Sequence, residues 1–114
     1  MSKKKIYIAG RVTGLPKNKV IKKFFEAQQE LEKLGFEVIN PIRVVNNWKT
    51  PWNTAMKQCI VALLDCDAVY MLSDWEKSKG AKVEYNIALS LQIPIYTDKY
   101  PQKHIQWNSS QPIP

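Results

Sequence analysis

The strongest constraint on the fold is a regular alternation of short apolar runs with longer segments of helical periodicity. Four runs rich in β-branched and aromatic residues indicate buried strands at residues 5–10, 36–39, 67–72 and 93–96. Strands that alternate with helices pair in parallel through right-handed crossovers. The sequence therefore predicts an α/β, flavodoxin-like or Rossmann-like three-layer sandwich with a parallel sheet in the strand order 2-1-3-4.

Three helices are predicted between these strands. The first begins near Asn18 and ends before Gly35, a residue typical of helix ends. The second has Thr50 as its N-cap and Pro51 as its first residue. The third spans residues 78–92. The second helix carries an apolar stripe of Trp52, Met56, Ile60, Leu63 and Leu64.

The length of 114 residues suits a single domain, and the composition is that of a globular protein, with 45% hydrophobic and 24% charged residues. We expect residues 1–98 to form this domain. Residues 99–114 are rich in polar residues and proline, which predicts an irregular C-terminal tail.

The net charge of +7 favours anionic partners in general. It does not choose among phosphates, nucleic acids and membranes, and clustered lysines more often form a solvated surface. No nucleic-acid-binding motif accompanies the charge, so nucleic acid is the least favoured partner. Two cysteines and one histidine lack metal-ligand spacing, and no phosphate-binding or dinucleotide-binding glycine motif is present. We therefore expect neither a metal nor another cofactor.

The cysteines and the hydropathy pattern indicate a cytoplasmic protein. Cys59 and Cys66 lie seven residues apart in what is predicted to be one helix, about two turns apart, so they cannot form a disulfide with each other. No secretory signal pattern is visible, and no apolar run approaches the roughly 18 residues that a membrane span needs. A membrane is therefore not an expected partner.

Glu84 is the most informative residue for function. In doubly wound sheets ligands bind beyond the carboxyl ends of the strands, where the strand order reverses. This rule places the loops that begin at Gly10 and Ser73 at the site. On the third predicted helix, the direction of Glu84 is surrounded by apolar residues, and a buried carboxylate is usually functional. The alternative is a Glu84 that extends to solvent or pairs with a lysine.

Ser78 precedes the same helix as a natural N-cap. The first amides of a helix and its dipole can hold an anion such as a phosphate, here beside the Gly10 loop. Capping alone also explains a serine at this position. Trp75 and Trp52 can stack on a base, although for Trp52 a place in the core or in a subunit contact is favoured.

Three segments together resemble a known superfamily. They are Tyr-Ile-Ala-Gly at residues 7–10, Leu-Asp-Cys-Asp-Ala-Val at 64–69, and Trp-Glu-Lys-Ser-Lys-Gly-Ala at 75–81 followed by Glu84. This combination, over roughly the first hundred residues, resembles the nucleoside 2-deoxyribosyltransferase superfamily. The similarity is to its small members, which are related to 2′-deoxynucleoside 5′-monophosphate N-glycosidases. Its most specific part is Ser-x-Gly-Ala-x-x-Glu.

The resemblance implies a retaining attack on an N-glycosidic bond. Glu84 would attack the anomeric carbon of a deoxyribosyl group, and Tyr7 would orient its carboxylate. Water would then release the sugar in a hydrolase, whereas a second base would accept it in a transferase. The expected partner is a small-molecule nucleoside or nucleotide, and Ser78 favours a 5′-monophosphate. The substrate-binding residues expected are Gly10, Arg11, Cys59, Trp75, Ser78 and Gly80.

Cys59 is the main departure from the pattern of the superfamily. Related enzymes have an aspartate there, eight residues before the position that matches Asp67. A thiol is a poor replacement for a carboxyl group as an acid. The alternative function is therefore a catalytically impaired module that binds nucleotides in the same pocket. The resemblance also implies a homodimer.

Overall fold

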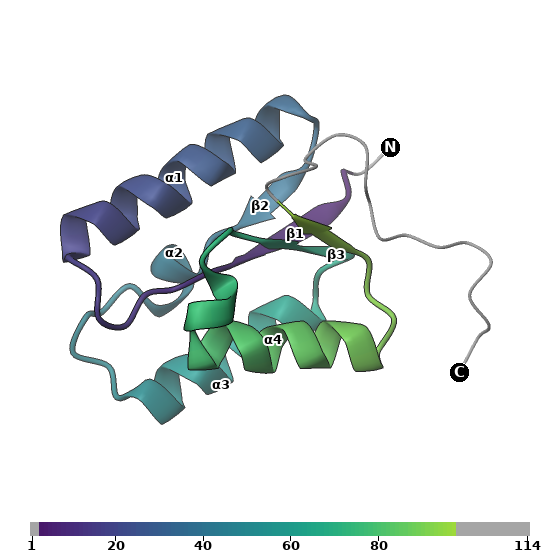
Figure 1. The fold of residues 1–114 in the computed structure, drawn as a ribbon. Coiled ribbons are helices and arrows are strands. Elements are labelled where there is room, and N and C mark those ends of the chain that lie inside the picture. Colours follow the sequence, from purple (N-terminus) through teal and green to yellow (C-terminus); the bar gives the residue numbers. More distant parts are fainter. Residues whose placement is uncertain (1–2, 98–114) are drawn as a thin grey trace.

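The computed structural model describes residues 3–97 of the chain, so the predicted tail at 99–114 lies outside the described residues. Four parallel strands form one sheet in the order β2-β1-β3-β4. This arrangement confirms the predicted α/β class and strand order (Figure 1). The strands are β1 (Lys5–Ala9), β2 (Glu37–Ile39), β3 (Ala68–Met71) and β4 (Ile95–Thr97).

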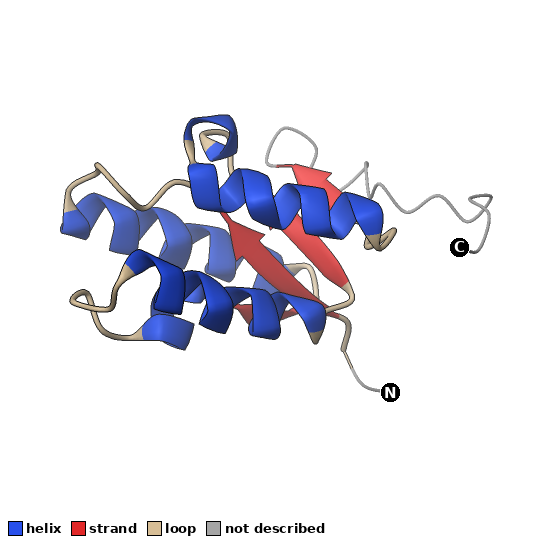
Figure 2. Cartoon of the chain, turned by 90° about the horizontal axis from the view of Figure 1, so that it is seen from below, coloured by secondary structure: helices blue, strands red, loops and turns tan. Residues whose placement is uncertain are grey.

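Helices cover both faces of the sheet. Figure 1 shows α1 (Lys17–Lys33) above the sheet and both α3 (Trp52–Leu64) and α4 (Lys79–Ser90) below it. Figure 2, seen from below, looks onto the layer formed by α3 and α4, with the strands visible between these two helices. The short helix α2 (Pro41–Val45) follows β2, and a single 3-10 turn, η1 (Trp75–Lys77), precedes α4. Residues 3–97 hold no helix with the length and hydropathy needed to cross a bilayer.

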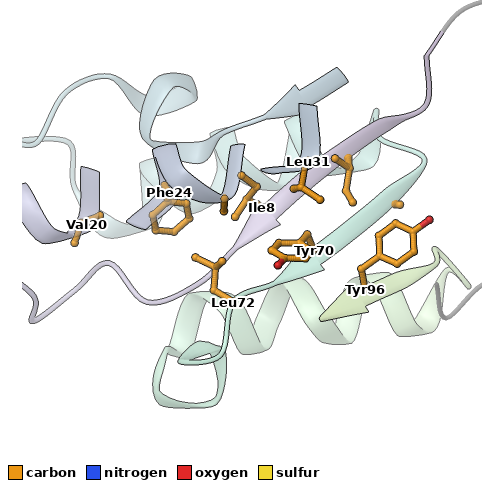
Figure 3. Close-up of a cluster of buried hydrophobic side chains, with 10 residues drawn as sticks. Ile8, Val20, Phe24, Leu31, Tyr70, Leu72 and Tyr96 are labelled. Atoms are coloured by element: carbon orange, nitrogen blue, oxygen red, sulfur yellow. The ribbon is translucent and has the colours of Figure 1, made fainter. Parts of the chain in front are cut away.

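The two faces of β1 belong to different cores because side chains alternate along a strand. Ile6 and Ile8 pack with α1 in a cluster that also contains Phe24 and Leu31, shown in Figure 3. Tyr7 and Ala9 face α3 and α4 in the second cluster. A tyrosine hydroxyl is therefore carried into the lower core, where it needs a hydrogen-bond partner.

The carboxyl ends of β1 and β3 are held close together. The amide of Leu72 donates to the carbonyl of Ala9 at 2.8 Å. A Cβ atom on Gly10 would lie 2.7 Å from Cδ1 and 3.0 Å from Cβ of Leu72, so only glycine fits without displacing Leu72. At the other end of the sheet, Asp67 accepts from the backbone amide of Lys5 at 2.8 Å.

The start of the second predicted helix is wrong by one residue. Pro51 is the N-cap of α3, with ψ of 146°, and the helix begins at Trp52; among the described residues no side chain caps it. Thr50 is therefore not the cap, because the Pro51 carbonyl already accepts the first helical bond, from Ala55 at 2.9 Å. Leu64, predicted in the apolar stripe, is 52% exposed.

Helix α2 was not predicted, although its capping residues are visible in the sequence. The side chain of Asn40 accepts from the amide of Ile42 at 3.0 Å, Pro41 is the first residue, and Asn46 ends the helix in the left-handed region. Helix α3 ends at Leu64, so Cys66 lies beyond it rather than in the same helix as predicted. Both cysteines are free thiols, as expected.

Candidate functional site

A cavity of about 660 Å³ opens where β1 and β3 end. Its walls come from β1 and the loop that follows it, from α2 and α3, and from the turn that leads into α4. The volume is within the range of small-molecule sites. The structure brings together in this cavity all of the sequence-predicted site residues except Trp75: Tyr7, Gly10, Arg11, Cys59, Ser78, Gly80 and Glu84.

Glu84 is buried in the wall of this cavity. It lies in the second turn of α4, its exposure is only 5%, and it points to the sheet because it shares a helix face with Gly80, Ala81 and Ala88. Its Oε2 accepts a short hydrogen bond of 2.5 Å from the Tyr7 hydroxyl. Burial raises the pKa of the carboxyl group from 4.5 to about 7, and the bond from Tyr7 opposes part of this rise. Glu84 therefore exchanges a proton near neutral pH.

Tyr7 and Cys59 both remain protonated beside Glu84. Burial, with the nearby Glu84 charge as the next cause, raises the pKa of the Tyr7 hydroxyl well above its ordinary value. Burial is also the main cause that raises the pKa of the Cys59 thiol. The Tyr7 hydroxyl is hydrogen-bonded to Glu84. At neutral pH it is thus a hydrogen-bond donor that holds the carboxylate, while Cys59 is a poor nucleophile.

The N-terminus of α4 forms another part of the cavity wall. The Ser78 hydroxyl accepts from the amide of Ala81 at 3.1 Å, which confirms its predicted capping role. A Cβ atom on Gly80 would lie 2.9 Å from Sδ of Met56, so the glycine lets α3 pack closely against this turn. The first amides of a helix lack acceptors within the helix and favour an anion. This part of the cavity therefore suits a phosphate or carboxylate.

The charged side chains around the cavity are mainly cations. Arg11, Lys77 and Lys79 line it, and among the described lining residues Glu84 is the sole carboxylate. The Nζ atom of Lys79 lies 4.6 Å from the ring centroid of Trp52, a cation–π contact. Because Glu84 is only partly ionised at neutral pH, the cavity carries net positive charge.

The structure places Trp52, and not Trp75, in the lining of the cavity. Trp52 lines the cavity and is 39% exposed, so it is not a core residue. Trp75 instead stacks on Tyr85, with ring centroids 4.4 Å apart, and lies in a separate hollow of about 310 Å³. The hydrophobic periodicity of α3 does not distinguish a residue in a cavity wall from a residue in the core. Lys77 and Lys79 were not predicted as site residues, because lysines are common on protein surfaces.

Within residues 3–97, no group of three or more histidine, cysteine, aspartate and glutamate side chains is arranged to hold a metal ion. A comparison with curated proteins found no match. One protein family matches, described as Domain of unknown function (DUF4406), over residues 4–97. The matched stretch contains every strand of the sheet and every residue of the cavity. Because it also covers most of the sequence, the chain belongs to the DUF4406 family.

Proposed function

We propose that this protein cleaves or transfers the N-glycosidic bond of 2′-deoxynucleosides or their 5′-monophosphates, with Glu84 as the nucleophile. The observation that carries the proposal is a buried carboxylate that borders the cavity and accepts a 2.5 Å hydrogen bond from Tyr7. The resemblance of residues 7–10, 64–69 and 75–84 to deoxyribosyltransferases supports the same chemistry. No cofactor takes part in it.

The reaction has two steps. A carboxylate oxygen of Glu84 attacks C1′ of the sugar, the C1′–N bond breaks, and the base leaves with the bonding electron pair. Water or a second base then attacks C1′ of the glycosyl ester and frees the carboxylate. Tyr7 holds the carboxylate in position through the bond to Oε2. Cys59 lines the cavity, and its raised pKa makes it a weak proton donor. Some bases must be protonated before they can leave, and we expect their cleavage to be slow.

The cations of the cavity favour a phosphorylated substrate. Arg11 and the lysines at 77 and 79 lie in the same cavity as the N-terminus of α4. A guanidinium can bind phosphate through two hydrogen bonds, and the helix dipole adds to the attraction. Trp52 lines the same cavity and is 39% exposed, so its ring is available for stacking on a base.

The direct test is to incubate the purified protein with the four 2′-deoxynucleosides and their 5′-monophosphates and to measure free base by chromatography. We expect base release from at least one monophosphate, faster than from the matching nucleoside. If protein at a concentration equal to that of the substrate releases no base from any of the eight compounds, the proposed reaction is wrong.

The pH dependence of cleavage should follow the ionisation of Glu84. A nucleophilic carboxylate must be deprotonated, and the pKa of Glu84 is about 7. Below pH 6, kcat/KM should therefore fall about tenfold for each pH unit, and it should level off above pH 8. Initial rates between pH 5 and 9 measure this profile. A rate that is constant over the whole range would contradict the role of Glu84.

Replacing Arg11 with methionine should weaken the binding of monophosphates more than that of nucleosides. Loss of a charge-assisted phosphate contact is expected to raise KM for a 5′-monophosphate about tenfold or more, with a smaller effect on the nucleoside. Arg43→Met, at an exposed position on α2, is the matched control. Equal effects of Arg11→Met on both substrates would remove Arg11 from the phosphate subsite.

A binding module is the second candidate, favoured by Cys59 in the position of the usual aspartate. It predicts a higher melting temperature with a deoxynucleoside monophosphate and recovery of the ligand unchanged. Release of base during the same incubation would exclude this alternative.

A homodimer fits the exposed aliphatic side chains of the lower helical layer. Val61 and Leu64 of α3 are 69% and 52% exposed, and Leu89 of α4 is 56% exposed. Such residues are common at subunit contacts when they gather on one face. Light scattering should give twice the mass of the chain, and Leu64→Glu should lower it toward that of one chain. A wild-type mass equal to one chain would contradict the dimer.

A further inference from the structure

The loop that supplies Arg11 to the cavity is held by two side chains that lie outside the cavity. The backbone amide of Arg11 donates to Oδ1 of Asp74 at 3.0 Å. The backbone carbonyl of the same residue accepts from Nζ of Lys23 at 2.6 Å. The backbone amide and the backbone carbonyl of Arg11 are therefore both bound by side chains from other parts of the sequence. The loop after β1 is tied in this way to α1 and to the turn that follows β3.

Asp74 and Lys23 also bind each other. Lys23 Nζ donates to Oδ2 of Asp74 at 2.5 Å. The side chain of Asp74 is 26% exposed and that of Lys23 is 27% exposed. Neither belongs to the described residues that line the cavity. Asp74 stands at the N-cap of η1, yet in the described part of the chain its side chain makes no capping bond there. Its two carboxylate oxygens are used instead on Arg11 and Lys23.

The side chain of Arg11 is folded over its own loop. Its Nε donates to the carbonyl of Thr13 at 3.1 Å. A Cβ atom on Gly14 would lie 2.9 Å from Nη2, and Gly14 has a φ of +86°, so glycine both forms the turn and leaves room for the guanidinium. With Nε used in the loop, the two Nη groups are the remaining donors for a ligand.

We infer that Asp74 and Lys23 are positioning residues that fix the Arg11 backbone and so keep its guanidinium in the lining of the cavity, where it can bind the phosphate of a ligand. This inference rests on the proposed function for its ligand, a 2′-deoxynucleoside 5′-monophosphate. A loop fixed before binding loses less conformational freedom when the ligand arrives, which improves affinity. The carboxylate of Asp74 would by itself repel a phosphate, so its presence beside Arg11 is explained by geometry rather than by charge.

The sign of one effect separates positioning from simple electrostatics. Asp74→Ala removes a negative charge next to Arg11, so a purely electrostatic role predicts tighter binding of 2′-deoxyadenosine 5′-monophosphate. Positioning predicts the opposite, a Kd about tenfold higher measured by calorimetry, with a change of less than threefold for 2′-deoxyadenosine. Tighter or unchanged binding of the monophosphate by a folded Asp74→Ala protein would overturn the inference.

Lys23 provides a second and independent pair of variants. Lys23→Met should raise the same Kd and KM with little change in kcat, whereas Lys23→Arg, which keeps the charge and donors, should restore them. Lys22→Met, at the preceding exposed position of α1, is the matched control and should leave the Kd unchanged. A Lys23→Arg protein as impaired as Lys23→Met, or a Lys23→Met protein with wild-type Kd, would contradict the inference.

Hydrogen exchange separates a failure of this inference from a failure of the proposed function. In the protein without ligand, the Arg11 amide should exchange at least tenfold faster in Asp74→Ala than in the wild type, because it loses its acceptor. If the wild type binds no deoxynucleotide, the proposed function fails, and the exchange rate still tests the contact. An unchanged exchange rate would show that Asp74 does not hold the loop.

Discussion

Glu84→Gln is expected to lower the rate of base release by about a thousandfold or more, because an amide oxygen cannot form the glycosyl ester that the mechanism requires. The substitution keeps the size of the side chain and an acceptor for the Tyr7 hydroxyl, so the cavity should keep its shape. Single-turnover measurements with the best monophosphate of the panel give the rate. Substrate affinity, measured separately by calorimetry, should change much less than the rate.

The matched control for this experiment is Glu76→Gln. Glu76 is an exposed carboxylate in η1, on the turn that leads to α4 and outside the described cavity lining. It should retain the wild-type rate. Mass spectrometry of the wild-type protein, quenched during turnover, should show a covalent sugar on the peptide that contains Glu84. A Glu84→Gln protein that releases base at the wild-type rate would rule out Glu84 as the nucleophile.

The position of Glu84 could be predicted because the order of the strands and the periodicity of the helix both point to it. Alternating strands and helices set the sheet order, the order sets the edge at which ligands bind, and helical periodicity turns Glu84 toward the core. The burial of Glu84 and its bond to Tyr7 agree with this reasoning. Tyr7 was expected at the site from the resemblance alone, and the structure places it on the face of β1 opposite to Ile6 and Ile8.

The parts of the site that were not predicted depend on contacts between segments far apart in the sequence. Trp52 lies at the start of α3, where periodicity alone cannot distinguish a core position from a cavity wall. The contacts of Arg11 with Asp74 and Lys23 join residues 63 and 12 positions apart, and no local pattern marks them. Trp75 lies in a segment that resembles the superfamily, but its neighbour Tyr85 determines where its ring packs.

Glu84→Gln is also expected to make the protein more stable at pH 8 while leaving its stability near pH 4.5 little changed. The pKa of Glu84 is about 7 in the folded protein and 4.5 ordinarily, mainly because of burial. Between these values the folded state holds a proton that the unfolded state has lost, so the free energy of unfolding of the wild type falls as pH rises. Above pH 7 the full cost is present, about 3 kcal/mol. Glutamine carries no charge at any pH and avoids this cost.

The measurement is urea unfolding of the wild type and of Glu84→Gln at several pH values from 4.5 to 8. Other carboxylates titrate in both proteins, so their effects cancel in the difference between the two free energies of unfolding. That difference should grow in favour of the variant as pH rises through the interval from 4.5 to 7. If the difference in the free energy of unfolding stays constant, Glu84 has an ordinary pKa. Glu84 would then still be mostly ionised at pH 5, and the cleavage rate should stay high there. If both expected results are obtained, the charged form of Glu84 lowers the stability of the fold and is the form that base release requires. Such a trade of stability for activity is typical of functional carboxylates.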